Sequence, residues 1–147
     1  MKRATSFVAF GALATLAWSL APAIGQDDSA LPQGFEAQPV LKSATTADGD
    51  AIQFPTGSPE IVSVVGTLAP NGRTALHQHP VPVYVYVLEG SLSVKTEGGE
   101  ARNYKAGDAF LESVGKWHQA FNESDQPAKI LVVFMGEEGK PTTEAKK

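Results

Sequence analysis

The three histidines of this 147-residue chain are the side chains best suited to carry chemistry, and their spacing predicts that they meet. His77 and His79 are two residues apart, so on a β-strand both side chains project from one face, within about 7 Å of each other. His118 lies in a later apolar run, beyond a turn at Gly115, where an antiparallel sheet would bring it beside the first pair. Neutral imidazoles bind divalent transition metals and, in threes, leave coordination positions open. We therefore expect His77, His79 and His118 to hold one ion, which Fe, Mn, Zn, Ni or Cu would satisfy.

The elements that must position these histidines read as short β-strands. Apolar and β-branched runs alternate with Gly, Pro, Asn and Asp at intervals of about ten residues, and no longer stretch has helical periodicity. This pattern predicts an all-β sandwich or barrel. The expected strands are residues 60–68, 74–79, 83–88, 91–96, 101–104, 109–113, 117–121 and 128–135.

Two clusters of residues resemble the paired motifs of the cupin superfamily. The first contains Gly72, His77, His79, Pro80 and the run 86–90, and the second contains Gly107, Asp108, Gly115, His118 and Asn122. The resemblance implies a double-sheet antiparallel jelly-roll barrel that holds a metal ion at its open end. The polar composition of both ends of the chain places the barrel domain at residues 48–136.

The chain departs from the cupin pattern at a position that would supply a metal ligand. Cupins usually carry a glutamate four residues after the second histidine, where this chain has Val83. Two smaller departures affect turns: Gly72 is one residue closer to the first histidine, and Ser113 stands where proline is common. Two arrangements stay open for the site. It is either an all-histidine triad, as the resemblance to diketone-cleaving and cysteine-dioxygenase-like members implies, or it recruits Glu112 as a fourth ligand or supporting carboxylate.

The resemblance implies a small-molecule oxidoreductase, in the manner of a metal-dependent dioxygenase, and Glu112 and Tyr104 are the polar candidates for a catalytic role. A non-oxidative isomerase or lyase would need a general base more than an oxygenase does. The alternative function is a binding module that holds a metal ion or small ligand without turning it over. The substrate and the native metal stay open at this point.

Alternation in the run 83–88 predicts an apolar interior and an apolar exterior. Val83 and Val85 share the parity of His79 and should line the cavity, whereas Tyr84, Tyr86 and Leu88 should face outward. An exposed row of this kind favours a contact with a second subunit, so we expect a homodimer.

The two ends of the chain differ in composition from the middle. Residues 1–25 have the layout of a signal peptide, with Lys2 and Arg3 ahead of an apolar run and small residues before a cleavage point after Gly25. This layout predicts export to a periplasmic or extracellular location, without stable membrane insertion. Residues 26–47 resemble a flexible arm, and residues 137–147 a disordered tail.

Charge and motif content exclude several functions. The formal net charge is -4, and it becomes -6 when residues 1–25, which carry two cations and no acid, are removed. No basic stripe is present, so a nucleic-acid partner is not expected. The sequence contains no phosphate loop and no nucleophile elbow, and it has no cysteine.

Overall fold

The computed structural model describes residues 33–147, and the chain divides into two units, Met1–Glu36 and Ala37–Lys147. All the elements below belong to the second unit. The predicted signal peptide and the first part of the predicted arm lie outside the described residues. Within residues 33–147, no helix is long and apolar enough to cross a membrane.

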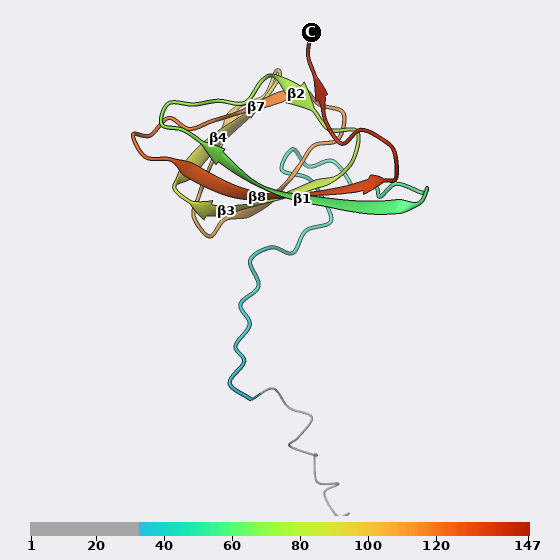
Figure 1. Ribbon diagram of the computed structural model, residues 1–147, viewed down its shortest axis with the longest axis horizontal. Coiled ribbons are helices and arrows are strands. Elements are labelled where there is room, and N and C mark those ends of the chain that lie inside the picture. Colours follow the sequence, from blue (N-terminus) through green and yellow to red (C-terminus); the bar gives the residue numbers. More distant parts are fainter. Residues whose placement is uncertain (1–32) are drawn as a thin grey trace, which may run out of the picture. The chain divides into compact units, whose positions relative to one another are not determined.

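Within residues 33–147, nine β-strands form two facing sheets (Figure 1). The four-stranded sheet has the order β1-β8-β3-β6, and the five-stranded sheet has the order β5-β4-β7-β2-β9. The strands are β1 (Pro59–Leu68), β2 (His77–Gln78), β3 (Val83–Glu89), β4 (Ser91–Thr96), β5 (Ala101–Lys105), β6 (Ala109–Glu112), β7 (His118–Phe121), β8 (Ala128–Glu137) and β9 (Glu144–Ala145).

All the named strand pairs are antiparallel. Within the described residues, the eight predicted strands are all present, with bounds that differ by at most three residues. The prediction of an all-β, double-sheet jelly-roll barrel is confirmed.

The interior is built by side chains that alternate across the sheets. In β3, Val83, Val85 and Val87 are fully buried, whereas the tyrosines between them are only half-buried. This is the alternation that the sequence predicts for a strand with one face toward the core. The remaining core includes Leu68, Leu92, Phe110, Ala128, Ile130 and Phe134.

The strand that carries the first histidines is very short. Strand β2 contains only His77 and Gln78, and Pro80 and Pro82 follow it closely. Proline has no backbone N–H to donate to a neighbouring strand, so the ladder cannot continue through these positions. His79 therefore lies just outside the strand, where its backbone is fixed by an isolated bridge to Val114 and by Gly115 N–H, which donates to His79 O at 2.8 Å.

The C-terminal residues differ from the expected disordered tail. Residues 138–147, here called the C-terminal segment, contain strand β9, which pairs with β2. Lys146 N–H donates to Leu76 O at 2.9 Å, and Gln78 Nε2 donates to Glu144 Oε2 at 2.7 Å. The exposed edge of β2 offers unpaired backbone groups, and the segment satisfies them.

The arm also differs in part from expectation. Residues 33–40 are exposed and lack regular structure, but Thr45 bridges Ala51 and Thr46 is buried. Residues 44–52 thus form a small hairpin that we call the plug hairpin. The barrel domain accordingly begins a few residues earlier than the predicted boundary at Asp48.

Candidate metal centre

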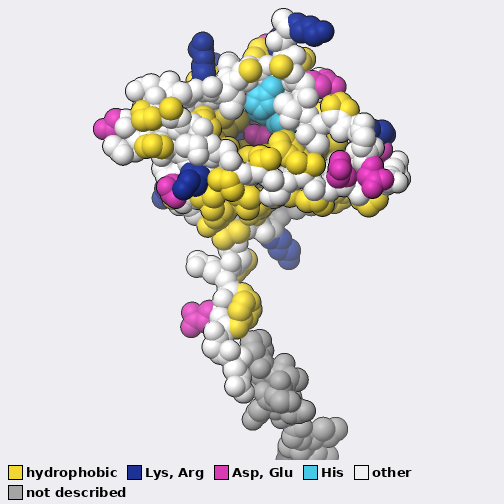
Figure 2. Space-filling model, in the orientation of Figure 1, with side chains coloured by type: hydrophobic (Ala, Val, Ile, Leu, Met, Phe, Trp, Pro, Cys, Tyr) yellow, Lys and Arg dark blue, Asp and Glu magenta, His cyan; other side chains and the backbone are white. Residues whose placement is uncertain are grey.

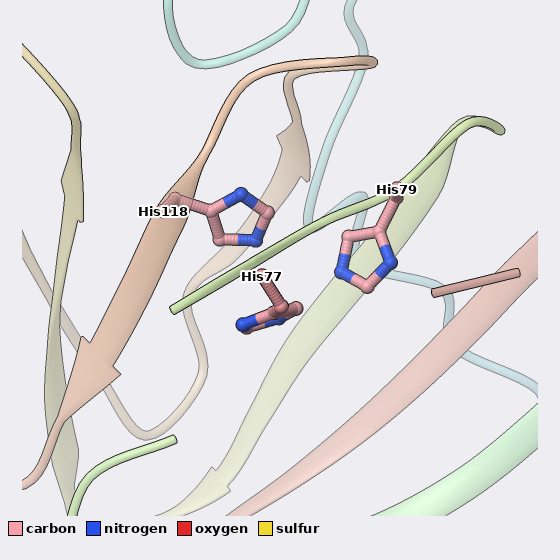
Figure 3. Close-up of side chains that lie close together, drawn as sticks. All are labelled: His77, His79 and His118. Atoms are coloured by element: carbon pink, nitrogen blue, oxygen red, sulfur yellow. The ribbon is translucent and has the colours of Figure 1, made fainter. Parts of the chain in front are cut away.

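The three histidines come together at the open end of the barrel. His77 in β2 is the direct register partner of His118 in β7, so their side chains share one face of the five-stranded sheet. One ring nitrogen from each of His77, His79 and His118 lies within 4.8 Å of the others. Figure 3 shows the three rings turned toward a common point, and Figure 2 shows histidine in the hollow of the molecule beside an acidic side chain.

Each histidine has its Nδ1 atom engaged by a backbone carbonyl. His77 Nδ1 lies 2.8 Å from Ala75 O, His79 Nδ1 lies 2.8 Å from Thr142 O, and His118 Nδ1 lies 2.9 Å from Lys116 O. A carbonyl only accepts hydrogen bonds, so each Nδ1 must carry the hydrogen. In the neutral rings the Nε2 atoms then keep their lone pairs, which is how metal-ligating histidines are commonly held.

One of these Nε2 atoms is also buried without a hydrogen-bond partner. Among the buried side-chain atoms of residues 33–147, His118 Nε2 is the one that has none. A buried polar atom in this state costs free energy unless something satisfies it. A divalent cation would do so, and the residues present therefore fit a metal ion. Ligand distances near 2.1 Å would require the rings to move slightly inward on binding.

Glu112 adds a carboxylate to the histidine cluster. Its oxygens lie 3.1 Å from His79 Nε2 and 3.5 Å from His118 Nε2, and its side chain is 10% exposed. Burial alone would raise the pKa of Glu112, but with no metal bound the two neighbouring rings, when protonated at Nε2, donate to this carboxylate and lower its pKa to about 2. The group is therefore an anion at neutral pH, directed at the point where the histidines meet.

The register of the sheet explains how Glu112 reaches the site. Glu112 in β6 is the direct partner of Val83 in β3, and register partners project from the same face. The Val83 side chain is fully buried in the interior. Cupins usually carry a glutamate at the position of Val83. In this chain the carboxylate comes instead from Glu112, the cross-strand neighbour of Val83.

The pKa values of two histidines reflect their surroundings. Burial lowers the pKa of His77. Burial would also lower the pKa of His118, but the Glu112 carboxylate beside it raises this pKa overall. At His118 the effect of the Glu112 carboxylate therefore outweighs that of burial.

Tyr104 lies on a cavity next to the metal site. The cavity, of about 20 Å³, is lined by Glu112 and His118 together with Tyr104 and Phe110. The Tyr104 ring stacks on Phe110 with centroids 3.8 Å apart, and burial raises the pKa of its hydroxyl. The structure therefore brings both predicted polar candidates, Glu112 and Tyr104, to the same cavity.

Sequence reasoning missed several groups that shape this site. Thr142 O orients His79, and Asp48 and Arg102 close the cavity. The Asp-Gly pair at 48–49 indicates a turn, but nothing in the local sequence indicates which part of the barrel that turn contacts.

Comparison with known proteins agrees with this architecture. Residues 64–134, which run from β1 to β8, match the family described as "Cupin domain". The tetracenomycin polyketide synthase protein TcmJ of Streptomyces glaucescens is 34% identical over 65 residues, which are 44% of this chain and 43% of that protein. The match thus spans less than half the length of this curated relative.

Solved structures share the fold. An uncharacterized conserved protein with a double-stranded beta-helix domain from Klebsiella pneumoniae aligns with a TM-score of 0.51 at 23% identity, covering 65% of this chain and 91% of that one. Oxalate decarboxylase of Bacillus subtilis, whose structure was studied for its Mn(II) centres, aligns at 27% identity with a TM-score of 0.51 over 58% of this chain and 23% of its own. With two facing antiparallel sheets, clustered motif histidines and this family match, residues 64–134 are a domain of the cupin superfamily.

Proposed function

We propose that this protein binds one divalent metal ion through His77, His79, His118 and Glu112, and that it is an oxidoreductase that acts on a small molecule in the manner of a dioxygenase. The observation that carries the proposal is the convergence of three Nδ1-anchored imidazoles and one buried carboxylate. Four protein ligands on a six-coordinate ion leave two positions, which suits a substrate together with dioxygen. The ion would supply Lewis acidity and, if it is redox-active, electrons for oxygen chemistry.

The residues around the ion have separable roles in this proposal. The three imidazoles fix its position. Glu112 contributes one negative charge and so favours a divalent over a monovalent cation. Tyr104 faces the same cavity, where its hydroxyl is available to hold or donate a proton to a bound small molecule.

A binding module without turnover is the second candidate, and a specific observation favours it. The cavity beside Glu112 and His118 has a volume of about 20 Å³, which is room for about one water molecule. A substrate needs more space than this, whereas a stored or sensed metal ion does not.

The first test is elemental analysis of the purified full chain beside variants of the site. We expect about one equivalent of metal in the wild type, almost none in His77→Ala and His118→Ala, and weaker retention in Glu112→Gln. The double variant Val83→Glu/Glu112→Val, which returns the carboxylate to the other strand, should regain affinity. Stoichiometric metal in either histidine variant would contradict the proposed ligand set.

A second measurement separates the enzyme from the binding module. After loading with Fe(II) under anaerobic conditions, the protein is exposed to nitric oxide, which occupies open positions on ferrous iron. An iron-nitrosyl signal in electron paramagnetic resonance supports the oxidoreductase. Its absence in a protein that retains one equivalent of iron supports the binding module.

Export and dimer formation complete the proposal. The predicted signal peptide supports a periplasmic or secreted location, which processing at Gly25 in an expressing cell would test.

The outer face of the four-stranded sheet supports a homodimer, because Ile61 and Val65 of β1 are 63% and 60% exposed. Light scattering of Val65→Lys against the wild type tests this interface, and a monomeric wild type would contradict it.

A further inference from the structure

The plug hairpin is attached to the barrel chiefly through side chains. Thr46 N–H donates to Asp50 O at 2.8 Å, which closes the turn, and Gly49 at its tip has a φ of +88° with nothing near its Cβ position. Among the described residues, one hydrogen bond joins the hairpin backbone to the barrel backbone, from Ala47 N–H to Leu111 O at 2.8 Å. The hairpin is thus an appended loop whose tip faces open space.

A single carboxylate makes three polar contacts between this loop and the barrel, beside the contact of Ser113 Oγ with Thr46 Oγ1 at 3.2 Å and a salt bridge from Lys116 to Asp50. Ser113 Oγ donates to Asp48 Oδ2 at 2.8 Å, and Thr96 Oγ1 donates to the same oxygen at 3.0 Å. The guanidinium of Arg102 pairs with Oδ1. All three donors belong to the barrel, on three different stretches of chain, and they converge on one anion. We call Arg102, Thr96 and Ser113 the anion cradle.

The cradle is well matched to a carboxylate. Burial would raise the pKa of Asp48, but the hydrogen bonds from Ser113, Thr96 and Arg102 outweigh burial and lower it. A guanidinium flanked by hydroxyl donors is the arrangement that proteins use to recognise carboxylates. The Asp48 side chain is 13% exposed, whereas that of Arg102 is 44% exposed and can be reached from solvent.

The cradle opens onto the metal site. Asp48, Thr96, Arg102 and Ser113 line the same cavity as Glu112 and His118. With Asp48 in place the cavity holds about one water molecule, so the loop carboxylate occupies the space that a ligand of the metal site would need.

We propose that the anion cradle is a binding subsite for the carboxylate of a small organic acid, and that Asp48 fills this subsite until such a ligand displaces it. Exchange of one carboxylate for another conserves the charge and the hydrogen bonds in the cradle. The remaining cost is release of a loop held by one backbone hydrogen bond, by the hydroxyl contact between Ser113 and Thr46 and by the exposed salt bridge between Lys116 and Asp50, and release would enlarge the cavity toward the metal site. The inference names a substrate class for the proposed function and rests on it in that respect, but the cradle itself contains none of the proposed metal ligands.

The test uses butyrate as the probe, with butyramide as its neutral counterpart, and follows binding to the full chain by calorimetry. The Asp48 carboxylate is an internal competitor, so a ligand can bind only to the fraction of protein in which Asp48 has left the cradle. The apparent affinity of the ligand is reduced in proportion to this fraction. We therefore expect Asp48→Ala to bind butyrate about ten-fold or more tightly than the wild type, and butyramide no better. Asp48→Asn keeps the shape of the side chain without its charge and should show a smaller gain in the same direction.

Matched controls come from the same turn and from the cradle. Asp50 also forms a salt bridge, with Lys116, but it does not line the cavity, so Asp50→Ala should leave butyrate binding unchanged. Adding Arg102→Gln to Asp48→Ala should abolish the gain. Circular dichroism and thermal unfolding verify that each variant is folded.

The outcomes separate this inference from the proposed function. His77 does not line the cavity, so His77→Ala should remove metal while the gain from Asp48→Ala persists. The inference is overturned if folded Asp48→Ala and Asp48→Asn show no gain, if Arg102→Gln leaves the gain intact, or if inorganic phosphate binds Asp48→Ala more tightly than butyrate does. A protein that binds no metal yet shows the gain would refute the proposed function alone.

Discussion

The plug hairpin and the C-terminal segment both reach the metal site, but they are attached to the barrel by different kinds of contact. The C-terminal segment pairs its backbone with β2 and presents Thr142 O to His79. The plug hairpin inserts the Asp48 carboxylate among three side-chain donors. Backbone pairing fixes a ligand in orientation, whereas a side-chain ion pair can be exchanged for another anion. In the proposed function, one end of the domain would thus support the metal ligands and the other would control access to them.

The largest expected effect comes from removing the C-terminal segment. Deletion of residues 138–147 takes away the carbonyl that orients His79, and loss of such a supporting contact typically weakens metal binding by about 10- to 100-fold. Competition with a chelator measures the change. Glu144→Ala, which loses its bond to Gln78 but keeps the backbone pairing, should stay within about two-fold of the wild type. A truncated protein with wild-type affinity would remove the distinction between the two segments.

Loss of Asp48 should act on stability and not on the metal. Asp48→Ala removes three hydrogen bonds from a partly solvated site, and we expect the free energy of unfolding to fall by about 1 kcal/mol. Chemical denaturation gives this value, and the chelator assay should give unchanged metal affinity. A large loss of metal from a folded variant would show that the plug hairpin supports the ligands too.

The contribution of Asp48 should depend on pH in a defined direction. The pKa of this group in the folded protein lies below its ordinary value of 3.8. Its stabilising contacts are therefore fully present above pH 3.8 and are lost as the pH falls through the lower folded-state pKa. Thermal unfolding of the wild type and Asp48→Asn should differ at pH 6 and converge in strong acid. Curves whose separation grows on acidification would have the wrong sign for this model.

The smallest expected effect concerns a hydroxyl in the C-terminal segment. Thr143 Oγ1 lies 3.1 Å from His79 Nδ1, but the Thr142 carbonyl already accepts from this atom at 2.8 Å. Thr143→Val should therefore change metal affinity by less than about three-fold. A loss as large as that of the truncation would transfer the orienting role from the carbonyl to the hydroxyl.

Much of the fold could be predicted from the sequence because its signals are local. Period-two alternation in β3 and Gly-containing turns between the strands reveal the barrel, and the His-x-His spacing reveals two of the three histidines on one face. Strand β9 could not be predicted in this way. Its residues are polar, and what orders them is the unpaired edge of β2, which lies more than sixty residues earlier in the chain.

The position of Glu112 was open for a related reason. Its sequence neighbourhood is compatible with a solvated strand end, and only the pairing of β6 with β3 directs it inward beside Val83. The plug hairpin is a similar case, since the partners of Asp48 are 48 to 65 residues away in sequence. Contacts set by long-range register carry no local pattern in the sequence.

The pairing of Val83 with Glu112 also bears on how such a site can change during evolution. The two positions face the same side of the sheet from adjacent strands, so we expect a chain with glutamate at both to retain the proposed metal site. From that intermediate either carboxylate can be lost by a single substitution. A lineage can thus transfer the acidic ligand from one strand to its neighbour while every ancestor along the path keeps a complete coordination sphere.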